Sequence, residues 1–461
     1  MAITNQEKCA QLLRRFGLGA PQSEVDSAVS RGYSETVEAM LAFEKAPNEI
    51  DDEEILTILK GDQNAIRPQM VTTWWIYRML LTKHPMQEKL ALFWHNHFAT
   101  SGSKVQQGQL LLQQIQMFQR IGATNFHDLV LEVSRDPAML VWLDGVTSVK
   151  GRPNENYARE LLELFTMGIG NYTEQDIKEA ARAFTGWSIR RATGSFFYRA
   201  DQFDTGEKTF LGKTGNWKGE DIVRMAVEHP ATAKFIARKF AHWFISDNPD
   251  QKVIDALAKT LVDSKYDVKA LIRRIAHSEA FADQKNHRAI IKNPIDFVIG
   301  TARTIGMGER LRQNQLSDAA GQRVAIAYLR LVGNILRKMG MAPLYPPSVA
   351  GWDGGTAWIS SGTMLERMRF ADTVMGQAAN RQRPLASQPP LYQLMAEARS
   401  LEEVVEKLQT GMDVKFGAET KTRMLGFLTE KGGLSGLTPR NPTAMNGLLK
   451  IVFASPEYQF A

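Results

Sequence analysis

Two histidines stand two residues apart in the segment WHNHF, residues 94–98, with an asparagine between them and an aromatic residue on each side. On a helix such positions point about 200° away from each other, so His95 and His97 cannot share one metal ion unless the helix ends between them. Three interpretations stay open: a hydrogen-bonded structural pair, which we favour, a histidine that is catalytic or contacts a ligand, and a metal site. We assign no metal ligand.

A second polar segment, NENYARELLELFTMG, residues 154–168, has the spacing of an amphipathic helix over residues 156–167, ended by Gly168. The polar arc of this helix carries Asn156, Arg159, Glu160 and Glu163. In a structural interpretation, Asn154 or Asn156 caps the helix. Arg159 then pairs with Glu155 and Glu163, at ~0.2–0.5 kcal/mol per pair.

The functional interpretation starts from the aromatic residues that flank this helix, because carboxylates covered by them must be paired or have shifted pKa values. A glutamate whose pKa is raised toward neutrality suits general acid or base catalysis. Glu160 and Glu163 are then the catalytic carboxylates, with His95 or His97 as the proton partner. The residues expected to orient a carboxylate or contact the substrate are Asn154, Asn156 and Arg159.

A third segment, YPPSVAGWDGGTAWISSGTMLERM, combines two prolines, three glycines and two tryptophans before a helix that starts at Ser361 or Thr363. Such a rigid turn presses Trp352 and Trp358 onto a neighbouring surface. The loop is either an ordered wedge that closes the core or a binding lip for a ring-shaped or extended ligand. In the second case both tryptophans contact the substrate.

No familiar nucleotide-binding or hydrolase motif accompanies these segments. The segment LGKTGN, residues 211–216, contains Gly-Lys-Thr, but a phosphate loop would need a glycine where the chain has Glu207. A GxSxG elbow, an HExxH helix and a GxGxxG loop are also missing. The sequence therefore names no cofactor.

The elements that must position these residues are mainly helices. In TEQDIKEAARAFTGW, Thr173 followed by Asp176 indicates a capping box, apolar residues recur at helical spacing, and Gly186 marks the stop. Pro85 divides a long periodic segment, because proline cannot continue a helix, and the second helix is expected from about residue 86 to residue 98. Aromatic residues and threonines beside Gly and Asp indicate a small β-hairpin-like excursion near residues 195–215.

The predicted architecture is a mainly α, multi-helical globular fold, without the fixed repeat of a solenoid. We expect an N-terminal helical lobe over residues 1–190 that carries the first two polar segments. A second helical lobe over residues 191–378 carries the hairpin and the YPPSVAGW loop. Residues 379–393, rich in Pro, Ser, Gln and Arg, are predicted to be a linker, and residues 394–461 a small C-terminal helical unit.

The composition, with 44% hydrophobic and 23% charged residues, is that of a folded globular protein. The net charge of +6 on 461 residues does not indicate nucleic-acid binding, and the basic residues Arg190, Arg191 and Arg199 are interpreted as a solvated loop. Cys9 is the only cysteine, so neither a disulfide within the chain nor a thiolate metal site can form. Because a secretory signal and a long apolar segment are missing, we expect a cytoplasmic protein without a membrane span.

Together these segments resemble a bacterial family known as domain of unknown function 1800. The matching segments, in order along nearly the whole chain, are LLRRFGLG, WHNHFATS, RDPAMLVWLDG, NENYARELLELFTMGIGNYTEQDIKEAARAFTGW, GEKTFLGKTGNWKGEDIV, FIARKFAHWF, YPPSVAGWDGGTAWIS and SPEYQ. The resemblance implies no assigned reaction. Relatives often have histidine where this chain has Phe203, so no metal or acid-base role is assigned to that loop.

The resemblance also implies a partner. Relatives are often encoded beside a protein of a second family of unknown function, 1501, which is similar to sulfatases and alkaline phosphatases. Many relatives carry export signals, so a periplasmic or cell-envelope location, reached by co-export with a partner, is the alternative to the cytoplasm. No oligomeric state is predicted.

Two hypotheses follow. In the first, the protein is an enzyme of hydrolytic or group-transfer type, with a Glu/His acid-base pocket where the WHNHF helix meets the NENYARE helix. In the second, it is a non-catalytic partner or assembly protein that works with the 1501-family protein. The first requires the polar residues of the two helices to converge around a cavity, whereas the second expects a closed hydrogen-bond network and an exposed apolar patch elsewhere.

Overall fold

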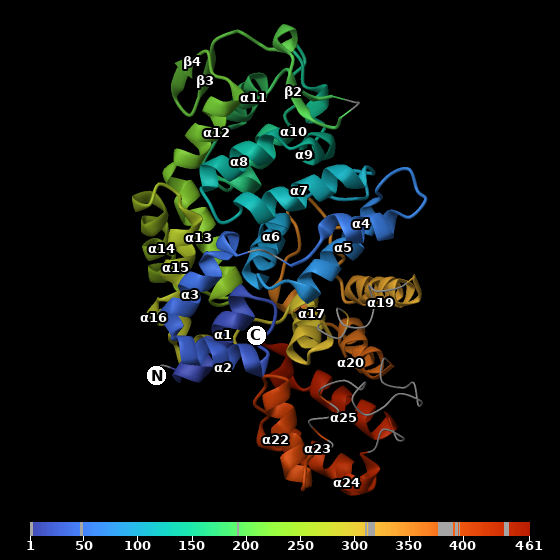
Figure 1. Ribbon diagram of the computed structural model, residues 1–461. Coiled ribbons are helices and arrows are strands. Elements are labelled where there is room, and N and C mark those ends of the chain that lie inside the picture. Colours follow the sequence, from blue (N-terminus) through green and yellow to red (C-terminus); the bar gives the residue numbers. More distant parts are fainter. Residues whose placement is uncertain are drawn as a thin grey trace.

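The computed structural model describes residues 3–46, 49–190, 193–308, 311, 319–376, 391, 395, 397–437 and 442–461. Over these residues the chain consists mainly of helices, with two small antiparallel two-stranded sheets (Figure 1). The predicted mainly α fold is confirmed. None of the described helices combines the length and the apolar character that a membrane span requires.

The N-terminal helices surround α6, which contacts α1, α5 and α7. α6 begins at Pro85, within one residue of the predicted start. Proline is tolerated there because the amides of the first helical turn have no acceptor within the helix, so the amide proton that proline lacks is not needed. The helices of this region are α1 (Asn5–Phe16), α2 (Gln22–Arg31), α3 (Tyr33–Leu41), η1 (Phe43–Lys45), α4 (Asp52–Lys60), α5 (Pro68–Leu81), α6 (Pro85–His97), α7 (Gly108–Ile121), α8 (Phe126–Arg135), α9 (Pro137–Trp142) and η2 (Gly145–Thr147).

The NENYARE segment differs from the predicted continuous α-helix. It forms α10 (Asn156–Glu160) and then one π-helical turn, η3 (Leu161–Phe165). The chain leaves this turn at Gly168, whose φ of +78° suits glycine. The predicted capping box starts α11 (Glu174–Ala183), where the side chains and backbone amides of Thr173 and Asp176 bond each other.

The strands form two hairpins rather than one. β1 (Trp187–Ile189) pairs with β2 (Phe196–Tyr198), with Ser188 opposite Phe197. β3 (Lys208–Phe210) pairs with β4 (Lys213–Gly215), with Thr209 opposite Thr214, and η4 (Ala200–Gln202) lies between the hairpins. The first hairpin therefore begins before the predicted range, because Trp187 continues directly from the turn that ends α11.

The second half of the chain packs its helices along two sides of this N-terminal group (Figure 1). Its helices are α12 (Gly219–Glu228), α13 (Pro230–Phe244), α14 (Gln251–Asp263), α15 (Val268–Ala276), α16 (Glu279–Ala282), η5 (Gln284–Asn286), α17 (Pro294–Thr304), α19 (Ala319–Lys338), η6 (Gly355–Trp358), α20 (Ser361–Gly376), α22 (Leu401–Gly411), α23 (Ala418–Glu430), α24 (Gly433–Gly436), α25 (Pro442–Ala454) and η8 (Pro456–Gln459). α19 lies against α5, and α20 lies against α25.

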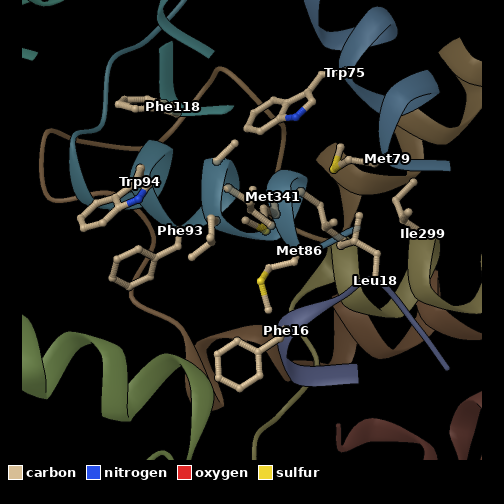
Figure 2. Close-up of a cluster of buried hydrophobic side chains, with 14 of the residues drawn as sticks. Phe16, Leu18, Trp75, Met79, Met86, Phe93, Trp94, Phe118, Ile299 and Met341 are labelled. Carbon is tan, nitrogen blue, oxygen red and sulfur yellow. The ribbon is translucent and has the colours of Figure 1, made fainter. Parts of the chain in front are cut away.

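Among the described residues the buried side chains form one cluster that extends from Cys9 to Tyr458 and includes residues of all the predicted units, with Leu391 from the predicted linker. Figure 2 shows part of it, with Trp75 of α5 and Trp94 of α6 among the side chains around α6. Both indoles are fully buried, and each donates its Nε1–H, to Glu88 and to the Gly122 carbonyl respectively, at 2.9 and 2.7 Å. The predicted unit boundaries stay predictions, and the predicted linker lies outside the described residues except for position 391.

Candidate functional site

His95 lies in the core and joins α6 to the loop before η6. Its side chain is fully buried, and its Nε2 accepts a hydrogen bond of 3.1 Å from the Leu344 amide. The imidazole packs at steep angles against the rings of Trp75 and Trp352, with centroids 5.5 and 5.7 Å away. Burial lowers the pKa of His95 to about 3, so the ring is neutral near pH 7. Its acceptor nitrogen, Nε2, is therefore already bonded to the loop that contains Leu344.

His97 lies at the C-terminal end of α6 and joins this helix to η3. Its Nε2–H donates to the Phe165 carbonyl at 3.1 Å, and its buried Nδ1 has no partner among the described residues. Burial, with a smaller contribution from Lys239, lowers the pKa of His97 to about 3. This contact brings the two predicted polar segments together through a backbone carbonyl, not through the glutamates.

Arg159 keeps one of its two predicted partners, Glu155, whereas Glu163 bonds elsewhere. The Arg159 guanidinium donates two hydrogen bonds of 2.8 Å to Glu174 and one of 3.4 Å to Glu155. Glu163 accepts a bond of 2.9 Å from the Tyr172 hydroxyl instead of pairing with Arg159. The pairing changes because the turn after η3 brings Tyr172 and Glu174 back beside the polar arc.

The remaining residues of the NENYARE segment are also held locally. Asn154 Oδ1 accepts from the Asn156 amide at 2.9 Å, but the N-cap residue of α10 is Glu155, whose side chain forms no cap bond, so neither asparagine is the predicted N-cap. Burial and the charge of Glu163 raise the pKa of Glu160, the one polar residue here with the shift expected of an acid-base group. His97 lines a cavity, described next. The polar residues of the NENYARE segment that were predicted to form a site with it do not line this cavity: Asn154, Asn156, Arg159, Glu160 and Glu163.

That cavity lies beneath the loop of residues 350–358 and has a volume of about 110 Å³. Its walls come from the end of α6, the second half of α13, the start of α17 and the loop itself. The lining residues are Phe93, Asn96, His97, Lys239, His242, Trp243, Asp247, Ile290, Ile291, Asn293, Asp296, Ala350, Trp352, Asp353, Gly354, Gly355 and Trp358. It holds several water molecules or one end of a larger ligand.

Glycine lets the loop lie directly on α6. Gly351 has a φ of +81°, and a Cβ there would lie 2.2 Å from the Asn96 carbonyl oxygen. The next amide, that of Trp352, donates to Asn96 Oδ1 at 2.7 Å. Trp352 and Trp358 are both buried, so the predicted tryptophans close the core and line the cavity at the same time.

α13 places a histidine and a lysine on the cavity wall, three residues apart and therefore on one face of the helix. His242 Nδ1–H donates to the Asp247 carbonyl at 3.1 Å, which leaves the lone pair on Nε2. No described residue bonds this Nε2, and a Cβ at Gly354 would lie 4.0 Å from it. Because the loop has a glycine at this point, Gly354 places no side-chain atom over Nε2.

Lys239 is half-buried and forms no ion pair within the described part of the chain. Its ammonium group lies 5.3 Å from the centroid of the Phe235 ring, and burial lowers its pKa. Trp243 adds a buried Nε1–H that has no acceptor among the described residues. The cavity wall thus carries a lone pair, an unpaired cation and an unused hydrogen-bond donor.

The carboxylates of the cavity differ in whether other side chains already bond them. Asp296 is engaged by Asn293 at 2.8 Å and by Lys89. Asp353 is exposed at the rim, and Asp247 lies beside Gly355, where a Cβ would be 3.9 Å from its carboxyl group. Over the described residues, no group of three or more His, Cys, Asp or Glu side chains is arranged to hold a metal ion.

Sequence reasoning identified His97, Trp352 and Trp358 of this cavity and missed Lys239 and His242. The segment FIARKFAHWF reads as an amphipathic helix, and its apolar stripe predicts burial correctly. The available signal was a lysine and a histidine at i and i+3 beside a tryptophan, on a helix rich in aromatic residues.

These features define a mainly α protein with a polar, tryptophan-lined cavity closed by a glycine-rich loop. Residues 11–460 match the model of the family described as protein of unknown function (DUF1800), and the chain belongs to this family. Comparison with curated proteins and with solved structures found no match.

Proposed function

We propose that the protein is an enzyme of hydrolytic or group-transfer type whose reaction takes place in the cavity beneath the 350–358 loop. One observation carries the proposal: the free Nε2 of His242 and the unpaired ammonium group of Lys239 line the same cavity from one face of α13. A proton acceptor beside a cation is the pair of groups that hydrolysis of a polar bond needs.

Each group has a role that follows from its chemistry. His242 Nε2 accepts the proton of a water molecule or a substrate hydroxyl, while its Nδ1–H stays bonded to the Asp247 carbonyl and fixes the ring. Lys239 stabilises negative charge that develops on the substrate, at a place where burial strengthens the interaction. Trp352 and Trp358 supply flat apolar surface for the substrate.

This location replaces the predicted Glu/His pocket, because the polar residues of the NENYARE helix do not line the cavity that His97 lines. His97, Trp352 and Trp358 keep a place in it, with His97 as a neutral wall residue. Glu160 and Glu163 lie outside it, and local hydrogen bonds support a structural role for the NENYARE arc.

The test is a hydrolysis assay with p-nitrophenyl acetate, phosphate, sulfate and glycosides, followed by comparison of variants on the substrate that is cleaved. We expect His242→Gln to lower kcat/KM by about 10²–10⁴-fold, the usual contribution of a general base. Lys239→Met should lower kcat. The matched controls, His127→Gln and Lys234→Met, change exposed or half-exposed residues of the same types and should leave activity unchanged. Equal activity of His242→Gln and wild type would refute the assignment.

A protein partner is the second candidate, favoured by one surface feature. Val324 and Leu331 of α19 are 49% and 43% exposed, and their spacing of seven places them on one face of the helix. Under this alternative, a 1501-family protein covers that face. Mixing the two purified proteins in size-exclusion chromatography tests it, with Val324→Ser/Leu331→Ser as the variant that should abolish co-elution.

A further inference from the structure

A second cavity, of about 490 Å³, lies between the first half of α5 and the last half of α19, away from the residues of the proposed reaction. Its volume falls within the range of about 300–1,000 Å³ that ligand pockets usually have. Leu59 and Gln63, at the end of α4, also line it. α5 and α19 lie beside each other in Figure 1.

The wall from α19 is a polar stripe. Arg330, Gly333, Asn334 and Arg337 follow the spacing i, i+3, i+4 and i+7, so they share one face of the helix. A Cβ at Gly333 would lie 3.3 Å from Ile76 Cδ1, which is tighter than ordinary contact. The glycine thus lets α19 approach α5 while the two arginines stand on either side of the approach.

The opposite wall includes the N-terminal end of α5. Arg67 directly precedes this helix of 14 residues, and Gln69 and Met70 of its first turn line the cavity. The first amides of a helix carry partial positive charge, so this end of α5 adds to the charge of Arg67. Cationic groups therefore face the cavity from both helices.

No carboxylate among the described residues balances these charges. None of the described lining residues is acidic, and Arg67, Arg330 and Arg337 form no ion pair within the described part of the chain. Of the three guanidinium groups, that of Arg337 donates a long hydrogen bond of 3.4 Å to Asn334 Oδ1. Three arginines beside one cavity repel each other, and an oxyanion that accepts their N–H groups removes the repulsion.

The floor between the arginines is apolar, with Met70, Ile76 and Leu329 among its residues. We propose that this cavity binds a small organic phosphate monoester, with the phosphate at the arginines and the organic part on the apolar floor. A phosphate dianion compensates three cations better than a carboxylate, which carries one charge. The same cavity would accept a free ester or the phosphorylated end of a larger molecule.

The experiment is isothermal titration calorimetry of the full chain with phenyl phosphate, benzoate, inorganic phosphate and benzyl alcohol. We expect phenyl phosphate to bind more tightly than benzoate or inorganic phosphate, and benzyl alcohol not to bind. Affinity should fall as salt rises from 50 to 500 mM, because exposed arginines are screened. Absence of phenyl phosphate binding at millimolar concentration would overturn the proposal, as would equal binding of benzyl alcohol.

Variants locate the binding. Arg330→Gln and Arg337→Gln should each weaken phenyl phosphate binding by about tenfold or more, the effect of losing one charge-assisted hydrogen bond. Arg274→Gln, an exposed arginine of α15, is the matched control and should bind like wild type. The three arginines are exposed, so their variants should fold, which the thermal midpoint checks. Unchanged binding by the Arg330→Gln/Arg337→Gln double variant would refute the site. The outcome is independent of the proposed reaction, because His242→Gln should bind phenyl phosphate normally.

Discussion

The two buried histidines of α6 predict how the protein responds to acid. In the folded chain His95 and His97 have pKa values of about 3, whereas the pKa of an unfolded histidine is about 6.5. Between these values the unfolded state binds more protons than the folded state, so the free energy of unfolding falls as the pH falls. The stability that neutral histidines provide is thus present above pH 6.5 and is lost toward pH 3.

The size of this effect follows from the pKa difference. Lowering the pH from 7 to 5 should cost about 2 kcal/mol for each histidine, or about 4 kcal/mol for the pair. Asp136 acts in the opposite direction, because burial raises its pKa to about 7 in the folded chain. Its folded form binds more protons than the unfolded form, so it should offset about 2 kcal/mol over the same interval.

Urea denaturation at pH 7 and at pH 5 separates these contributions. In His97→Gln the glutamine amide can still donate to the Phe165 carbonyl but does not titrate, so the loss of stability between the two pH values should be smaller by about 2 kcal/mol than in wild type. His95→Gln should behave alike. Asp136→Asn should lose about 2 kcal/mol more than wild type. If all these variants lose as much stability between pH 7 and pH 5 as wild type, the lowered pKa values of the two histidines and the raised pKa of Asp136 are refuted. The control is His127→Gln, which changes a half-exposed histidine.

Three further predictions concern the loop and the helices. Gly351→Ala should lower the free energy of unfolding by about 2 kcal/mol or more, measured in urea, because its φ of +81° and the Asn96 carbonyl both exclude a Cβ; an unchanged midpoint would contradict the loop position. Arg159→Gln should shift the thermal midpoint much less than Gly351→Ala, since its ion pairs are solvent-exposed, and a larger shift would show a buried role. Lys239→Met should raise the thermal midpoint while activity falls, because it removes an unpaired cation from a half-buried place; a lower midpoint would show a hidden partner.

The local features of the fold were predictable because their causes lie within a few residues. The capping box of Thr173 and Asp176 and the helix start at Pro85 depend on side chains near the affected amides. The π-turn after Glu160 was not predictable, since its extra residue does not alter the apolar spacing by which helices are recognised. Its consequence, the contact of the Phe165 carbonyl with His97, was missed for the same reason.

The site was predicted only in part because its members come from distant segments. His95 bonds an amide 249 positions further along the chain, and α13 contributes Lys239 and His242 from a helix whose sequence indicates only an apolar stripe. The polar arc of α10 suggested a pocket by its density of charges, but exposed charges that pair with neighbours give the same pattern. Tryptophans in a glycine-rich loop were the more reliable signal.

The central claim is that the cavity beneath the 350–358 loop, with His242 and Lys239 on one wall, is the reactive site. The most direct measurement is kcat/KM of His242→Gln, relative to His127→Gln, on the substrate that wild type hydrolyses, with both variants shown to keep the wild-type thermal midpoint. The account predicts a loss of about 10²-fold or more for His242→Gln alone. Equal kcat/KM for the two variants would contradict it.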